Sequence, residues 1–209
     1  MKKILIADDH AILRKGIIQL LKEDLEDYQF VEASNGIEVI SLVRKDKFEL
    51  ILLDISMPEL NGIDALKQIR AMRFETPVIM LTVQAEDQYA IRVLKAGAQG
   101  FLNKDTAPEE LLTAIKKVLS GKKYITETVS DLLINNIRLK KEGKEIDLLS
   151  DREIQVMQHM AEGQSISEIA KNIGLSVNTI STYRSRIMNK LSLKNNAAII
   201  RYAIDNNII

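Results

Sequence analysis

Short apolar segments alternate with amphipathic segments over residues 1–121, and this alternation limits the possible folds more than any other feature. The apolar segments are five predicted strands, at Lys3–Ala7, Phe30–Ala33, Leu50–Asp54, Val78–Thr82 and Gly100–Leu102. Between them, apolar residues recur every three or four positions, which predicts helices. Strands that alternate with helices form a parallel sheet covered on both faces. We therefore predict an α/β doubly wound, five-stranded parallel sheet of the flavodoxin-like type.

The sequence changes character after residue 121. Residues 122–147 are polar and charged around one apolar stripe at helical spacing, formed by Val129, Leu132, Leu133 and Ile137. This predicts a linker that carries one helix and then a flexible segment. From residue 148 onward the pattern is helical, with helices expected at about 151–162, 166–173, 177–191 and 195–206. The chain thus divides into a first domain at 1–121, a linker at 122–147 and a small all-α four-helix domain at 148–209.

The composition excludes several kinds of protein and site. Cysteine is absent, so disulfides and thiolate metal sites are excluded. The histidines are His10 and His159, and we interpret His10 as a loop or capping residue rather than a metal ligand. No apolar run approaches the roughly 20 residues that span a bilayer, and the first residues lack a signal-peptide pattern. We therefore expect a cytoplasmic protein without a membrane partner.

Charge is distributed unevenly along a chain whose net charge is zero. From Lys171 onward there are six cations and one anion, Asp205. A local basic excess in a neutral protein indicates contact with a polyanion. A solvated helix face explains the excess equally well, so charge alone does not decide between the two.

Polar residues follow four of the five predicted strands. Asp8 and Asp9 follow the first strand, Asp54 and Thr82 end the third and fourth, and Lys104 follows the fifth. In a parallel sheet these ends lie along one edge, so the five side chains should converge. Crowded carboxylates favour a divalent cation that prefers oxygen ligands, and Mg²⁺ is such a cation. The Thr82 hydroxyl and the Lys104 ammonium would in addition stabilise a phosphoryl group on Asp54. Each residue alone has an ordinary structural explanation, but five at successive strand ends make coincidence improbable.

The motifs around these residues resemble the receiver domains of two-component response regulators. The matching segments are 6–10 (IADDH), 53–58 (LDISMP), 61–62 (NG), 81–82 (LT) and 97–105 (GAQGFLNKD). The resemblance implies that Asp54 accepts a phosphoryl group from a phosphohistidine of a sensor histidine kinase. It also implies that Asp9 and Asp54 bind Mg²⁺ directly, that Asp8 acts through water, and that the backbone carbonyl of Ser56 completes the protein ligands.

The same resemblance implies a switch and shows some departures from the family pattern. Phosphorylation would pull Thr82 inward and let Phe101 turn into the space behind it. Phe101 stands where many receivers have Tyr, and Asp105 where many have Pro. Ser56 and Gln84 lie two residues beyond Asp54 and Thr82, where we expect them to tune the lifetime of the phosphoryl group.

The helical end resembles the LuxR-type helix-turn-helix of the NarL/FixJ subfamily. The matching segments are 149–153 (LSDRE), 161–163 (AEG), 167–170 (SEIA), 175–176 (LS), 178–180 (NTI) and 190–191 (KL), and 183–186 (YRSR) resembles the GacA/UvrY-like branch. Ser150 and Ser165 each precede a Glu by three residues, as in a capping box. Five apolar side chains should form a small core, namely Ile169, Ile173, Ile180, Ile187 and Leu191.

The resemblance also implies contacts with double-stranded DNA. Helix 177–191 would lie in the major groove as the recognition helix. The residues expected on its outward face are Asn178, Ser181, Thr182, Ser185 and Arg186, and by family position Ser181, Thr182 and Ser185 would face bases. Those expected to contact phosphates are Thr179, Tyr183, Arg184, Arg186 and Lys190. Because many relatives carry Lys at the position of Ser181, the small hydroxyls here favour water-mediated or shape readout over direct guanine contact.

The oligomeric state follows from the small size of the DNA-binding module. Such a module binds weakly alone, so we expect a homodimer on an inverted repeat when the protein is phosphorylated. The last helix could supply part of that interface, or its apolar residues could close the domain core; these are Ala197, Ala198, Ile200 and Ile204. A helix-turn-helix that contacts protein instead of DNA is the alternative.

Our hypothesis is a phosphorylation-activated, DNA-binding transcriptional regulator that is not an enzyme beyond its own phosphorylation and dephosphorylation. An aspartyl-phosphate hydrolase is a second hypothesis, but no substrate loop or cap insertion interrupts the strands. A third is a DNA binder that does not depend on phosphorylation and whose first domain only dimerises. The complete set of strand-end residues argues against the third hypothesis.

Overall fold

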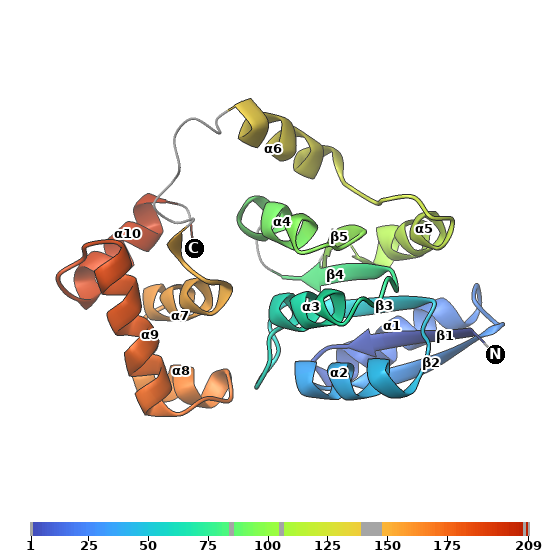
Figure 1. Ribbon diagram of the computed structural model, residues 1–209, viewed down its shortest axis with the longest axis horizontal. Helices are drawn as coiled ribbons and strands as arrows, with labels where there is room; N and C mark the ends of the chain where they lie inside the picture. Colours follow the sequence, from blue (N-terminus) through green and yellow to red (C-terminus); the bar gives the residue numbers. More distant parts are fainter. Residues whose placement is uncertain (1, 84–85, 105–106, 139–147, 207, 209) are drawn as a thin grey trace. The chain divides into compact units, whose positions relative to one another are not determined.

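The computed structural model describes residues 2–83, 86–104, 107–138, 148–206 and 208. The chain divides into two compact units, residues 1–137 and 138–209, and Figure 1 shows the elements of each. The predictions for Gln84, Asp105 and the segment 139–147 lie outside the described residues. Among the described helices, none combines the length and apolar character needed to cross a membrane.

The elements alternate strand and helix in the first unit and are all helical in the second. In chain order they are β1 (Lys2–Ala7), α1 (Ala11–Lys22), β2 (Tyr28–Ala33), α2 (Gly36–Lys45), β3 (Leu50–Asp54), α3 (Gly62–Ala71), β4 (Val78–Thr82), α4 (Glu86–Lys95), β5 (Gly100–Asn103), α5 (Ala107–Leu119), α6 (Glu127–Arg138), α7 (Asp151–Ala161), α8 (Ile166–Asn172), α9 (Val177–Lys190) and α10 (Asn196–Asp205).

The five strands form one sheet in the order β2-β1-β3-β4-β5, and every neighbouring pair is parallel. The predicted fold class is therefore confirmed. Every residue of β3 and β4 is buried, as expected when helices cover both faces of a sheet. Helices α2 and α3 pack side by side, and α4 lies against β5 (Figure 1).

One core of the first unit lies between the sheet and two helices. It joins alternate strand residues to apolar positions of α1 and α5, including Ile4, Ile6, Leu50, Leu52, Ile79 and Leu81 from the sheet, Ile17 and Leu21 from α1, and Leu111 and Ile115 from α5. Because all five strands run in the same direction, their carboxyl ends lie along one edge of the sheet. The polar residues at the strand ends therefore meet at this edge.

Three strands are longer than the sequence indicates, and the first of them, β1, begins at Lys2 instead of Lys3. β2 begins at Tyr28 because this residue pairs with Lys2 across the sheet, and the Lys2 ammonium lies 5.5 Å above the centre of the Tyr28 ring. β5 extends to Asn103, which pairs with Thr82 at the end of β4. All three extensions follow from pairing with a neighbouring strand, which the local sequence does not show.

The linker helix is present as α6, within the first compact unit except for its last residue. Val129 of its predicted apolar stripe is fully buried. The segment before α6 is joined to the sheet, because the backbone N–H of Tyr124 donates to the Gln99 carbonyl at 2.8 Å. The chain is therefore anchored beside β5 before α6 begins.

The second unit contains the four predicted helices. Ser150 and Ser165 each form a complete capping box, with Glu153 and Glu168 respectively. The predicted core residues are all buried, namely Ile169, Ile173, Ile180, Ile187 and Leu191. In α10, which packs on α7, Ile199 and Ala203 are also buried.

Candidate functional site

Asp8, Asp54 and Lys104 meet at the edge of the sheet where the strands end. Asp54 is the last residue of β3, Asp8 directly follows the adjacent β1, and both are buried. The Lys104 ammonium lies 2.6 Å from Asp8 Oδ2 and 2.9 Å from Asp54 Oδ2, and 7% of its side chain is exposed. The backbone N–H of Lys104 donates to the Thr82 carbonyl at 2.7 Å, which holds the end of β5 beside β4. Two buried carboxylates thus share one buried cation.

This cluster alters the protonation of its members. Burial raises the pKa of Asp54 from 3.8 to about 6; Lys104 acts in the opposite direction and Asp8 adds to the rise. Burial alone would lower the pKa of Lys104, but Asp54 and Asp8 raise it above its ordinary value. Asp54 is therefore mostly ionised near neutral pH while Lys104 stays charged, as a nucleophilic carboxylate beside a fixed cation requires.

The same carboxylates fit a divalent cation. Asp8, Asp9, His10 and Asp54 each place one potential ligand atom within 4.8 Å of the others. Asp8 Oδ2 and Asp54 Oδ2 are buried against the Lys104 ammonium, at 2.6 and 2.9 Å. A carboxylate oxygen that accepts from one ammonium keeps a second lone pair, with which it can also bind a cation. Oxygen ligands of this kind suit Mg²⁺.

His10 lies closer to the cluster than the sequence indicates. It occupies the N-cap position of α1, as interpreted, but its side chain forms no capping hydrogen bond. Its Nδ1 lies 2.8 Å from Asp9 Oδ1 and 3.1 Å from Asp8 Oδ1, and its backbone N–H donates to Asp8 Oδ1 at 2.8 Å. The imidazole is thus a neighbour of the acidic pair, and its position next to Asp9 in the chain was the signal for it.

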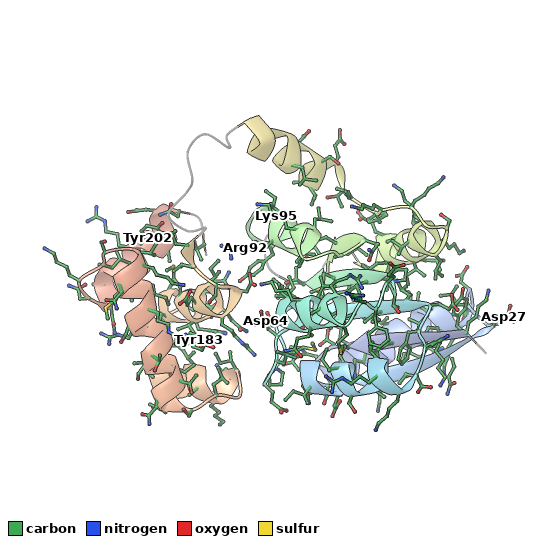
Figure 2. The ribbon with its side chains drawn as sticks, in the orientation of Figure 1. Asp27, Asp64, Arg92, Lys95, Tyr183 and Tyr202 are labelled. Carbon is green, nitrogen blue, oxygen red and sulfur yellow. The ribbon has the colours of Figure 1, made fainter. Side chains whose placement is uncertain are left out.

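The loop after Asp54 depends on a close backbone approach. A Cβ on Gly62 would lie 1.9 Å from the Asp54 carbonyl oxygen, so only glycine fits at this position. Asn61 caps α3 by accepting from the backbone N–H of Asp64 at 2.7 Å, and Asp64 is labelled in Figure 2. The Ser56 backbone N–H hydrogen-bonds to the Asp54 carboxyl group and lowers its pKa. The Asn-Gly pair in the sequence therefore has two roles: Asn61 caps α3, and Gly62 lets the loop pass close to the backbone of Asp54.

The two expected switch residues are both fully buried. Thr82 ends β4, next to the strand that carries Asp54. Phe101 pairs in register with Met80 of β4, and its ring is inside the domain in this structure. The inward movement of Thr82 and the turning of Phe101 on phosphorylation stay predictions.

The second unit presents a polar helix face. Helix α9 begins at the N-cap Ser176 and turns Ile180 and Ile187 into the core. Of the residues expected to face or grip DNA, the exposed ones are Asn178, Thr182, Ser185, Arg186 and Lys190, and the partly buried ones are Thr179, Ser181, Tyr183 and Arg184. Helix α8 packs on α9 and ends in a turn at Gly174, whose φ is 67°. This is the geometry of a helix-turn-helix.

Three basic side chains of α9 already have partners within the unit. The Arg186 guanidinium lies 5.9 Å from the centre of the Tyr183 ring, and Tyr183 is labelled on α9 in Figure 2. Arg184 Nε donates to Asn196 Oδ1 at the start of α10. The Lys190 ammonium lies 2.7 Å from Glu153 Oε2, and 2% of the Glu153 side chain is exposed. The sequence analysis missed this ion pair, because the two residues are 37 positions apart.

A doubly wound domain with carboxylates and a lysine at its strand ends, joined to a helix-turn-helix unit, defines a class of protein: the response regulators. The family model described as "Response regulator receiver domain" matches residues 4–116. A second, "Bacterial regulatory proteins, luxR family", matches residues 147–203. The chain belongs to the NarL/FixJ subfamily of response regulators, with a receiver domain and a LuxR-type DNA-binding domain.

Relatives share this organisation over their whole length. The response regulator UvrY of Escherichia coli strain K12 is 34% identical over 206 residues, which cover 98% of this chain and 94% of UvrY. The response regulator GacA of Pseudomonas aeruginosa is 31% identical over 211 residues, which cover 100% of this chain and 98% of GacA. A solved structure of RcsB from Salmonella enterica serovar Typhimurium, bound to promoter rprA in the presence of the phosphomimetic BeF3⁻, is similar with a TM-score of 0.63 at 31% identity, covering 96% of this chain and 97% of that one.

Proposed function

We propose that this chain is a transcriptional regulator activated when Asp54 accepts a phosphoryl group from a sensor histidine kinase in the cytoplasm. The observation that carries the proposal is the buried Lys104 ammonium, which touches both Asp54 and Asp8 at the end of the sheet. A carboxylate that is ionised, buried and beside a fixed cation can attack phosphorus without its negative charge being left uncompensated. The bond from phosphorus to the kinase imidazole breaks as the bond to the Asp54 carboxylate forms.

The Mg²⁺ ligands in this proposal are Asp9 and Asp54 directly, Asp8 through water, and the Ser56 carbonyl. When bound, the cation supplies positive charge to the phosphoryl oxygens. Lys104 is already within reach of Asp54 and can transfer one of its contacts to a phosphoryl oxygen. The Thr82 hydroxyl donates to another, and the movement of Thr82 lets Phe101 follow. The receiver shifts between two states because the modified Asp54 binds these residues differently from the unmodified one.

The output of the switch is DNA binding by α9. We assign base contacts to Ser181, Thr182 and Ser185, with Asn178 beside them on the exposed face. The hydroxyls of Thr182 and Ser185 donate to the carbonyls of Asn178 and Ser181 at 2.9 and 3.0 Å, so their lone pairs are directed outward as acceptors. Acceptors suit the amino groups of adenine and cytosine in the major groove better than guanine.

The remaining polar residues of α9 bind the DNA backbone in this proposal; they are Thr179, Tyr183, Arg184, Arg186 and Lys190. The relative RcsB, bound to a promoter with a phosphomimetic present, supports both the DNA ligand and its link to phosphorylation. A homodimer fits as well, because α10 buries Ile199 and Ala203 but leaves Ile204 54% exposed. The four apolar residues named for this helix in the sequence are exposed (Ala197, Ile204) or partly buried (Ala198, Ile200), so they do not form the core and are available for an interface.

Phosphoryl uptake by Asp54→Asn tests the proposal. Wild type and Asp54→Asn are incubated with Mg²⁺ and a small phosphodonor, and the phosphorylated fraction is measured by intact mass. Asp46→Asn is the matched control, because it makes the same change at a carboxylate that pairs with Lys3 at 2.7 Å, away from the site. We expect uptake by wild type and Asp46→Asn and none by Asp54→Asn. Equal uptake by Asp54→Asn would reject the proposed acceptor.

DNA binding is tested separately by capturing genomic fragments with the BeF3⁻-treated and untreated full chain. Treated wild type should enrich defined fragments that treated Asp54→Asn does not. Binding should weaken steeply with salt, since phosphate contacts release counterions. Equal enrichment by both proteins would show that DNA binding is independent of phosphorylation.

A further inference from the structure

Arg14 is a partly buried residue next to the acidic pair, and the proposed function does not use it. It lies one turn into α1, and 13% of its side chain is exposed. One terminal nitrogen donates to the backbone carbonyl of Asp8 at 2.6 Å, while Nε donates to Glu32 Oε2 of β2 at 2.9 Å. Arg14 therefore connects the end of β1 to a carboxylate on the neighbouring strand.

The contact falls on the peptide group that joins the two carboxylates. The Asp8 carbonyl and the Asp9 N–H belong to one planar unit, so a bond to this carbonyl sets the orientation of both. The other polar groups of Asp8 are also held: its N–H donates to the Ala33 carbonyl at 3.2 Å, and Oδ1 accepts from His10. Arg14 supplies the restraint on the carbonyl, at the point where β1 has ended and its ladder with β3 stops at Ala7.

We infer that Arg14 is a positioning residue for the divalent cation: it orients the Asp8–Asp9 peptide so that both carboxylates face the metal. This inference rests on the proposed function, since it concerns the same Mg²⁺ site. Groups that hold metal ligands in place typically change metal affinity about 10- to 100-fold when they are removed. Glu32 gives the guanidinium a second anchor, because its carboxylate accepts from Arg14 Nε while a terminal nitrogen holds the Asp8 carbonyl.

The direction of the change in Mg²⁺ affinity on removing Arg14 distinguishes a positioning role from a simple effect of charge. Arg14 is a cation near an anionic cluster, and through space it repels Mg²⁺. Removing the charge alone would therefore tighten Mg²⁺ binding. Losing the orientation of the Asp8–Asp9 peptide would weaken it, so the direction of the change decides between the two effects.

The test measures Mg²⁺ affinity of the unphosphorylated full chain by calorimetry, with amide NMR shifts of Asp9 as a second readout. Arg14→Met keeps the apolar stem and removes the donors and the charge. Lys3→Ala is the matched control, because Lys3 lies at the opposite end of β1 and its ammonium pairs with Asp46. The side chains of the two acidic partners are equally exposed, 40% for Asp46 and 39% for Glu32.

We expect Arg14→Met to bind Mg²⁺ about 10-fold more weakly than wild type, and Lys3→Ala to bind as wild type or slightly more tightly. Unchanged or tighter binding by Arg14→Met would overturn the inference. If circular dichroism shows that Arg14→Met is unfolded, Arg14→Lys decides, because it keeps the charge but cannot hold the carbonyl and Glu32 with separate N–H groups. Weaker binding by Arg14→Lys then supports the inference, and wild-type affinity rejects it.

Failure of the proposed function gives a different result. If wild type itself binds no Mg²⁺, both the metal site and the role of Arg14 are rejected. If wild type binds Mg²⁺ and the Arg14 variants bind it equally well, the site stands and only the positioning role is lost.

Discussion

Replacing Gly62 with alanine would push directly on the backbone of Asp54. The added Cβ would lie 1.9 Å from the Asp54 carbonyl oxygen and 2.9 Å from its carbonyl carbon. An ordinary C···O contact is roughly 3.3 Å, so the two backbones must separate by about 1.4 Å. The obstacle is the end of β3, in which every residue is buried, so it cannot move aside as a flexible side chain does. We expect the free energy of unfolding of the first unit to fall by about 1–3 kcal/mol.

Gly16→Ala is the matched control for this substitution. Gly16 lies inside α1, and nothing lies within 4 Å of the position that its Cβ would occupy. The same chemical change should therefore stabilise the protein by about 0.5–1 kcal/mol, because alanine favours a helix interior over glycine. Urea unfolding of the full chain measures both variants, and hydrogen exchange of the β3 amides assigns the transition to the first unit.

The two variants should also differ in phosphoryl uptake. Gly62→Ala displaces Asp54 and should slow uptake, whereas Gly16→Ala should not. A Gly62→Ala protein within about 0.5 kcal/mol of wild type, smaller than typical overpacking effects, would refute the reasoning. So would an equal loss of stability in Gly16→Ala, since the close approach could then not be the cause.

Three further predictions concern charged groups. The pKa of Asp54 is about 6 in the folded protein, against the ordinary value of 3.8, so ionisation of Asp54 between these values destabilises the folded wild type. In EDTA, the free energy of unfolding of Asp54→Asn minus that of wild type should therefore rise between pH 4 and 7, by up to about 3 kcal/mol. Lys104→Met should lower the free energy of unfolding by about 3–5 kcal/mol at pH 7, since Asp8 and Asp54 lose their shared cation, and by less at pH 5, where Asp54 is protonated. Lys190→Ala should cost about 1–2 kcal/mol, because Glu153 is buried while the lysine, 38% exposed, is partly screened.

Each of these has an outcome that contradicts it. A pH-independent difference between Asp54→Asn and wild type in urea unfolding would show that Asp54 titrates normally. A Lys104→Met protein with wild-type stability would mean that water or relaxation compensates the carboxylates. For Lys190, the control is Arg186→Ala, which should reduce DNA affinity without lowering the melting temperature; equal melting temperatures for both variants would contradict a structural role for Lys190.

Local patterns in the sequence were sufficient for the elements and the fold class. The capping boxes at Ser150 and Ser165 and the buried stripe of Ile180 and Ile187 depend on residues three to seven positions apart. Such spacings are set by the helix itself. The convergence of Asp8, Asp54 and Lys104 was also predictable, because parallel strands place their ends at one edge whatever the loops between them do.

What the sequence alone determined, then, is which segments form helices and strands, which faces are apolar, and that polar groups gather where the strands end. The tertiary structure decided which polar atoms meet: that Lys104 is shared by two carboxylates, that Arg14 reaches the Asp8 carbonyl, and that Lys190 pairs with Glu153. The reason is geometric. Periodicity depends on neighbours within a few residues, whereas an ion pair depends on distances between separate elements, which only the packing of side chains between them sets.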